Sequence, residues 1–420
     1  MKLFSDYESE VRSYIRSFPV VFDRADGSII WDDQGNEYLD FFAGAGTLNY
    51  GHNPKAMNQA LISYLNHQGI LHSLDKATVA KQKFIEKFYQ TIIKPRGLDY
   101  KIQFTGPTGT NAVEAAIKLA RRVTQRGNVI AFTQGYHGLT MGALAITAND
   151  YYHQQIYASR TNVYHAPYDG YFGETINTAN YIRQLIEDSS SGVSMPAAII
   201  LETIQGEGGV NTASKEWLQE IEKLCREKNI FLIIDDIQVG NGRSGEFFSF
   251  EFAGIKPDIV CMSKSIGGGL PLAFTLIKPE LDQWLPGEHT GTFRGNNLAF
   301  VAAAELLTYW DNDELSQAVL QKGHMIKRCL EQFVSDFPQL KMSVRGRGMI
   351  WGLEIPVAGF AKQLSRTLFE NKLLVETCGK EDSVVKILPP LIIKQAQLEE
   401  GLSKIGKGLQ MLASRENVAA

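Results

Sequence analysis

The order of apolar and polar positions predicts alternating strands and helices from about residue 100 onward. Five short, mostly apolar runs suit strands: 101–104, 128–132, 197–201, 230–234 and 258–262. Segments with helical spacing, such as 112–122 and 215–228, lie between them. Runs that are apolar throughout suit strands with both faces buried. This βαβα order therefore predicts an α/β fold with a mostly parallel sheet flanked by helices.

The two ends of the chain show different patterns. Residues 1–25 suit a short helix followed by an extended stretch, and residues 28–41 read as a hairpin whose turn is centred on Gly35. Long helices dominate from about residue 300, and 345–354 begins a further strand pattern. We therefore expect a second, smaller sheet besides the parallel one.

Composition narrows the class of protein. The 420 residues leave room for two domains, and 44% hydrophobic with 21% charged residues is typical of a soluble globular chain. A net charge of −4 without a Lys/Arg block argues against a nucleic-acid partner. No apolar run approaches the roughly 18 residues that a membrane span needs, so we expect no membrane association. No His-Glu-x-x-His motif occurs, and we expect no metal site.

Cysteines and the first residues indicate a compartment. The four cysteines lie far apart and form no Cys-x-x-Cys pair, which suits reduced thiols that are mostly in the core. Residues 1–10 are charged and lack an apolar stretch, so we expect no secretory signal. Together these features predict a cytoplasmic protein.

The most informative stretch surrounds Lys264, which lies between two serines directly after the apolar run 259–262. Three glycines, 267–269, and Pro271 follow. A lysine at the end of a buried strand is costly unless its amine is neutral, paired or covalently used. Lys264 is therefore either a Schiff-base lysine that holds an aldehyde cofactor such as pyridoxal phosphate, or a surface lysine before a flexible turn.

Asp235 and Asp236 stand at the carboxyl end of another buried strand, the edge where open α/β sheets bind ligands. A buried carboxylate needs a cationic partner, and a protonated pyridine nitrogen would serve. The alternative is a helix-capping aspartate beside a solvated one. Residues 106–111 place a glycine-containing turn at a helix start, which suits either an anion site or an ordinary cap. Tyr136 and His137, between two glycines, suit either a flat ring or the core.

Residues 240–245 form a literal Gly-x-Gly-x-x-Gly pattern. A dinucleotide site needs this pattern directly after the first strand of a βαβ unit, at the start of a helix. Here it follows a late strand and leads into Glu246 and three nearby phenylalanines, so we reject a dehydrogenase.

Taken together and in this order, these motifs resemble the class III aminotransferases, pyridoxal 5'-phosphate (PLP) enzymes of fold type I. The resemblance covers nearly the whole chain. It implies a large PLP-binding domain at 49–315 and a small α+β domain built from 1–48 and 316–420. It also implies small amino-acid and oxo-acid substrates, and a homodimer or a higher homo-oligomer with shared active sites.

The resemblance assigns roles around the cofactor ring. Lys264 would form the Schiff base and move the proton, and Asp235 would pair with the ring nitrogen. Ile237 would pack on one ring face and Tyr136 on the other. Gln238 would reach the ring hydroxyl.

The remaining cofactor contacts follow from the same resemblance. His137 would lie beside Tyr136, and Gly109 and Thr110 would bind the phosphate. Thr292, in the run 287–296, would reach the phosphate of the neighbouring subunit.

The resemblance also concerns the substrate. Glu202 and Glu207 match a cofactor-side and a substrate-side glutamate. Many class III enzymes that use glutamate carry an arginine three residues before a Pro-Pro-Leu, where this chain has Lys386. Lysine is a point charge rather than a planar fork, so either Lys386 or an arginine elsewhere binds the α-carboxylate.

Within the class, four stretches resemble the branch that transfers an amino group from L-glutamate to L-aspartate 4-semialdehyde, giving L-2,4-diaminobutyrate and 2-oxoglutarate. They are 16–25 (RSFPVVFDRA), 41–52 (FFAGAGTLNYGH), 95–100 (PRGLDY) and 104–115 (FTGPTGTNAVEA). That branch supplies diaminobutyrate to ectoine, siderophores and peptides. One alternative is a class III enzyme for another ω-amine, such as ornithine or 4-aminobutyrate, and a more distant one is an aminomutase. A non-catalytic PLP-fold regulator would need a DNA-binding domain, for which residues 1–25 are too short.

Overall fold

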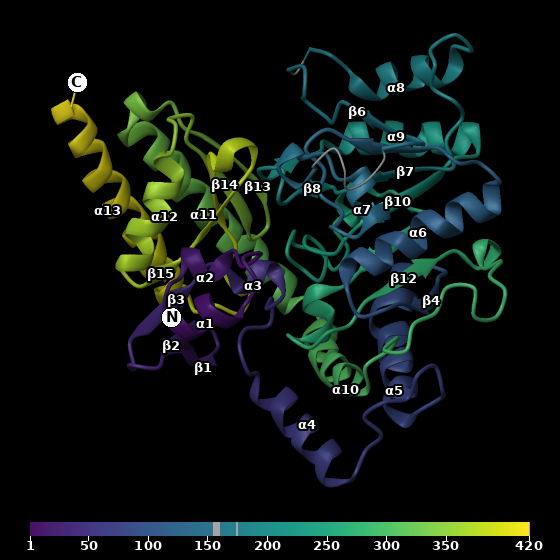
Figure 1. The fold of residues 1–420 in the computed structure, drawn as a ribbon, viewed down its shortest axis with the longest axis horizontal. Coiled ribbons are helices and arrows are strands. Elements are labelled where there is room, and N and C mark those ends of the chain that lie inside the picture. The colour runs from purple at the N-terminus through teal and green to yellow at the C-terminus, as the bar shows by residue number, and fades with distance from the viewer. Residues whose placement is uncertain (154–159, 174, 420) are drawn as a thin grey trace.

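The structure is a computed structural model that describes residues 1–153, 160–173 and 175–419 (Figure 1). Its central sheet has seven strands, in the order β4 (Lys101–Phe104), β12 (Phe274–Ile277), β11 (Ile259–Met262), β10 (Phe231–Asp235), β7 (Ala198–Leu201), β5 (Val129–Phe132) and β6 (Val163–Ala166). Strand β12 runs antiparallel to both of its neighbours, β4 and β11, and the remaining pairs of this sheet are parallel. The predicted α/β fold with a mostly parallel sheet is confirmed.

Alternate residues of the central strands enter two different cores. In β10, Leu232 and Ile234 join the core that contains the inner face of α9 (Lys215–Lys228), whereas Ile233 joins the core formed with α6 (Gly109–Thr124). Successive side chains of a strand point to opposite faces of the sheet. Both faces are therefore covered, which explains why the inner strands β5, β7 and β11 are apolar throughout.

Helix α6 begins three residues earlier than the pattern of apolar positions indicates. Thr108 accounts for this start, because it has extended backbone angles and its side chain accepts a hydrogen bond from the amide of Asn111. The other α-helices are α1 (Lys2–Tyr7), α2 (Tyr14–Ser17), α3 (Ala43–Gly46), α4 (Lys55–Asn66), α5 (Val79–Phe88), α7 (Met141–Ile146), α8 (Thr178–Glu187), α10 (Asn297–Leu306), α11 (Glu314–Asp336), α12 (Phe360–Glu370) and α13 (Gln395–Ala419).

The two ends of the chain meet in one part of the molecule. The predicted hairpin is formed by β2 (Ile29–Asp32) and β3 (Glu37–Asp40), and β3 also pairs with β15 (Leu373–Leu374). The same small sheet contains β1 (Phe22–Asp26). Figure 1 shows the N-terminal (purple) and C-terminal (yellow) elements together on one side of the central sheet. The domain boundaries given above stay a prediction.

The predicted second sheet is present near the C-terminus. Its strand order is β13 (Ser343–Arg347), β14 (Ile350–Glu354), β17 (Val384–Ile387) and β16 (Glu376–Cys378). A separate short hairpin of β8 (Ile204–Gln205) and β9 (Asn211–Thr212) comes between β7 and α9 in the chain. Among the residues described above, no helix has the length and apolar character needed to cross a bilayer.

Candidate active site

Lys264 and Asp235 lie at the same edge of the central sheet. Strands β10 and β11 are parallel neighbours, so their carboxyl ends meet there. Lys264 follows β11 and has a φ of 52°, a left-handed conformation that is rare for a residue other than glycine. Its Nζ donates to the carbonyl oxygen of Ala45 at 2.9 Å. Burial lowers the pKa of Lys264, which favours the neutral amine that a nucleophile needs.

Asp235 is held by a buried histidine. Its Oδ2 lies 2.7 Å from Nδ1 of His137, and its Oδ1 accepts a hydrogen bond from the amide of Ile237 at 3.2 Å. Burial acts to lower the pKa of His137, but the hydrogen bond and charge of Asp235 outweigh it and the pKa is raised. Asp235 therefore favours the protonated form of His137.

Gln238 provides a free acceptor beside this pair. Its Nε2 donates to Ala45 at 3.0 Å and to Glu207 at 2.9 Å. Its Oε1 is buried and, within the described part of the chain, accepts no hydrogen bond. A buried acceptor of this kind is costly unless a ligand supplies the donor. Gly206 permits the arrangement, because a Cβ there would lie 1.7 Å from Gln238 Oε1.

Ile237 lies against the first turn of α6. A Cβ at Gly109 would lie 3.0 Å from the Cδ1 atom of Ile237, so a larger residue would press on that side chain. Thr110 contacts Thr140 through its hydroxyl at 2.6 Å. The first amides of a helix have no acceptor within it, so the start of α6 suits an anion such as a phosphate.

Glu202 and Tyr136 complete the cofactor side. Glu202 is buried and accepts hydrogen bonds from the amides of Tyr136, at 3.0 Å, and Gly206, at 3.2 Å. Burial raises the pKa of Glu202 to about 7, although the charge of His137 acts against the rise. The Tyr136 ring meets the Tyr152 ring edge to face, with centroids 5.6 Å apart.

Three ionisable side chains form the other end of the site. Lys386 Nζ lies 2.8 Å from Glu207 Oε1 and 2.9 Å from Glu376 Oε1, and its side chain is 0% exposed. The hydroxyl of Tyr14 donates to Glu376 Oε2 at 3.3 Å. Burial raises the pKa of Glu207, but Lys386 and then Lys264 lower it to about 2. Lys386 is thus a buried cation beside the ionised carboxylate of Glu207.

The structure connects most of the residues predicted for the site. The connected residues are Lys264, Asp235, Ile237, Gln238, Gly109, Tyr136, His137, Glu202, Glu207 and Lys386. Thr110 lies close to Gly138, next to His137. Thr292 is in an exposed loop, where its carbonyl oxygen accepts from His72 at 2.9 Å. The roles of these residues stay a prediction.

The sequence interpretation missed Glu376, Tyr14 and Ala45. A signal for Glu376 was present in the sequence. This acid interrupts the mostly apolar run 373–378, just as Lys386 interrupts the apolar run 384–388. Ala45 lies in a run of small residues, 43–46, that suits either a wall against a ligand or a plain loop, and Tyr14 carried no signal.

A family model described as aminotransferase class III matches residues 12–409. The chain belongs to the class III aminotransferases. A diaminobutyrate–2-oxoglutarate transaminase of Wolinella succinogenes is 58% identical over 417 residues, which cover 99% of this chain and 98% of that protein. The enzyme of the same name from Halalkalibacterium halodurans is 52% identical and covers 100% and 98%.

A solved structure of the ornithine aminotransferase from Toxoplasma gondii is similar over 99% of this aminotransferase and 94% of that chain, with a TM-score of 0.86 and 26% identity. Its title reports partial occupancy of PLP at the active site. The predicted family and fold type I are confirmed, and PLP is the cofactor. The residues present fit this group, since Lys264 offers an amine, Asp235 a buried carboxylate and Gln238 an unpartnered acceptor.

Proposed function

We propose that this aminotransferase moves an amino group between L-glutamate and L-aspartate 4-semialdehyde, giving 2-oxoglutarate and L-2,4-diaminobutyrate, reversibly and by a ping-pong mechanism. The observation that carries the proposal is the full-length identity of 50–58% to several enzymes that bear the name diaminobutyrate–2-oxoglutarate transaminase.

The site residues divide the chemistry between them. PLP, when bound, supplies an aldehyde that exchanges amines and a ring that takes up electrons from the substrate Cα atom. Lys264 would hold this aldehyde through Nζ, and the amine, once released, would move the proton at the reacting carbon. Asp235, supported by His137, would keep the ring nitrogen protonated, and Gln238 Oε1 would accept from the ring hydroxyl.

Lys386 would bind a substrate carboxylate at the other end. Glu207 is its more exposed partner, with 24% of the side chain accessible against 5% for Glu376. Glu207 would pair with Lys386 while the terminal-amine substrate is bound and release it for glutamate. This exchange would let one site accept two substrates whose reacting amines lie at opposite ends.

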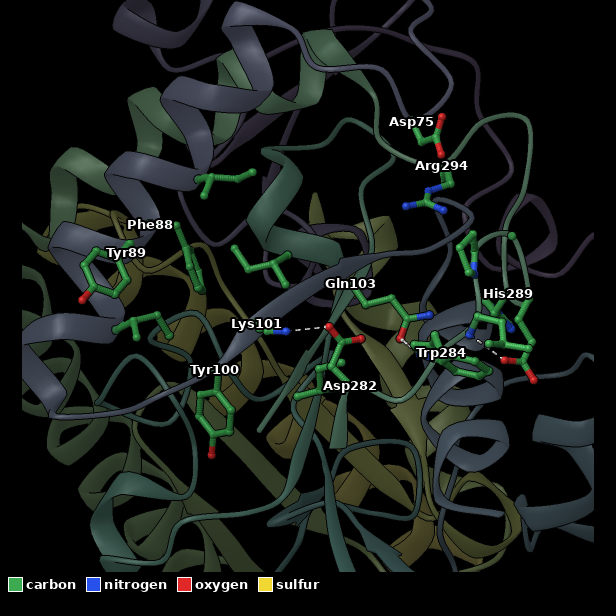
Figure 2. Close-up of a pocket in the computed structure, with 18 residues that line it drawn as sticks. Asp75, Phe88, Tyr89, Tyr100, Lys101, Gln103, Asp282, Trp284, His289 and Arg294 are labelled. Atoms are coloured by element: carbon green, nitrogen blue, oxygen red, sulfur yellow. Dashed lines mark hydrogen bonds and ion pairs between the residues drawn. The ribbon is translucent and has the colours of Figure 1, made fainter. Parts of the chain in front are cut away.

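The exposed apolar side chains near Thr292 support a homodimer, or a higher assembly of dimers. Leu74, Ile85, Leu285 and Phe293 are all exposed. A cavity of about 680 Å³ lies on this face, and Ile85 and Leu285 are among its lining residues. Figure 2 shows the Lys101–Asp282 ion pair and the Gln103–Trp284 hydrogen bond in its wall. A second copy would cover this face, which contains none of the site residues connected to Lys264. Thr292 of each copy would then lie at the phosphate site of the other copy.

A donor panel tests the proposed substrate. With 2-oxoglutarate as acceptor, diaminobutyrate should give a kcat/KM well above those of ornithine and 4-aminobutyrate. A higher value for either competitor would keep the family and overturn the substrate. The ectoine pathway as consumer of the product and a cytoplasmic location stay predictions.

A further inference from the structure

Glu376 and Lys386 are directly opposite each other on neighbouring strands. Residue 376 of β16 pairs with residue 386 of β17 in the antiparallel register, so their side chains share one face of the sheet. Glu376 Oε1 lies 2.9 Å from Lys386 Nζ, and its side chain is 5% exposed. The register therefore gives Lys386 a permanent, buried acid, besides the more exposed Glu207.

The charges of this cluster do not balance. If both acids are ionised, Glu207, Glu376 and Lys386 together carry one excess negative charge. A substrate carboxylate that binds to Lys386 would add another in the same buried region. Burial of several like charges is unfavourable, and a protein relieves it by neutralising one of them.

Glu207 and Glu376 differ in how readily each carboxylate takes up a proton. Lys386 donates a hydrogen bond to Glu207, which also accepts from Gln238, and both bonds favour the ionised form of Glu207. Glu376 Oε1 lies near Lys386 but accepts no hydrogen bond from any described residue, and Oε2 accepts only the long 3.3 Å bond from Tyr14. Burial raises the pKa of Glu376 to about 7, with Lys386 acting against the rise. Glu376 is therefore the acid that takes the proton.

Glu376 is faced by titratable and charged groups from several elements. They are Lys386 of β17, Glu207 of the turn after β8, Tyr14 of α2, Lys264 at the start of the short 3-10 helix η5 (Lys264–Gly267) and Cys378 of β16. From α12 and the turn after β16, Lys362 and Asp382 pair with each other at 2.8 Å.

We propose that Glu376 takes up one proton from solvent when a substrate carboxylate displaces Glu207 from Lys386. The proton adds to Oε2, and the contact with Tyr14 reverses, so that the protonated acid donates to the tyrosine oxygen. Glu376 is thus a positioning residue that acts through Lys386. The inference rests on the proposed function only in taking Lys386 as the carboxylate site.

Glutarate tests this inference, because it has the two carboxylates of 2-oxoglutarate but no amine or carbonyl to exchange. Its binding to the PLP-loaded enzyme is measured by calorimetry at pH 8, in two buffers with different ionisation heats. Wild type should take up about one proton per site, and its affinity should fall about tenfold per pH unit above the titration of Glu376. Glu376→Gln should take up none and bind with little pH dependence.

A control and a second variant make the outcomes decisive. Glu354→Gln removes an acid from the adjacent strand β14, where Arg345 is its partner, and should keep the uptake. Wild-type binding without proton uptake overturns the inference even if Glu376→Gln does not fold. Uptake that persists in Glu376→Gln but disappears in Glu207→Gln also overturns it. Failure of the donor panel would leave these results intact and would contradict only the proposed substrate.

Discussion

The hydrogen bond between His137 and Asp235 has a measurable consequence for cofactor affinity. His137→Phe removes the hydrogen-bond partner that positions Asp235 Oδ2, which would weaken the hold of this carboxylate on the ring nitrogen. The two side chains are 1% and 6% exposed, and the bond is 2.7 Å long. A buried hydrogen bond to a charged group contributes about 1.5–3 kcal/mol. The PLP dissociation constant should therefore rise by about 10- to 150-fold.

The assay is a titration of the cofactor-free enzyme with PLP, followed by visible absorbance. A double-mutant cycle with Asp235→Asn separates this interaction from general damage. His137→Phe should weaken binding strongly in the wild-type background and only slightly when residue 235 is asparagine. Equal weakening in both backgrounds would show that His137 does not act through Asp235 and would refute the reasoning.

Glu207→Ala should change the ratio of the two half-reaction rates, because only one of them uses Glu207 as the partner of Lys386; an unchanged ratio in single-turnover kinetics would contradict the exchange. Burial raises the pKa of Asp236 from 3.8 to about 7, so the folded protein keeps this proton where the unfolded chain has lost it, and stability falls as pH rises across that window. The thermal midpoint of Asp236→Asn minus that of wild type should therefore increase from pH 4 to pH 7, and a constant difference would count against it. Subunits with Thr292→Glu should regain activity when mixed with Lys264→Ala subunits, since one site of a mixed dimer would then hold both intact residues; two inactive partners that stay inactive after exchange would speak against a shared site.

The pattern of apolar residues predicted β5, β7, β10 and β11 because these strands are buried on both faces. It missed β6, where Tyr164 and His165 interrupt the apolar run. It also missed β12, whose apolar run follows the glycine-rich turn 267–269 and reads as its continuation. Strand position within a sheet depends on long-range pairing, so neither the antiparallel direction of β12 nor its place between β4 and β11 could be predicted.

The candidate site was predictable where it depends on strand ends. Asp235 ends β10 and Lys264 follows the adjacent parallel strand β11, and that topology alone brings them to one edge. The link between Glu376 and Lys386 depends instead on the register of β16 against β17, which the residue pattern of either strand does not determine. Tyr14 reaches Glu376 from 362 residues away in the chain, a contact that only the folded arrangement of both ends produces.

The visible spectrum of the purified enzyme, with Lys264→Ala as control, tests the central claim most directly. The account predicts a yellow absorption band that bleaches with 2,4-diaminobutyrate, returns with 2-oxoglutarate and is altered in the variant. A band that ignores diaminobutyrate but bleaches with another ω-amine would contradict the proposed substrate. A protein that shows no band, even after PLP is added, would contradict the whole account of the site.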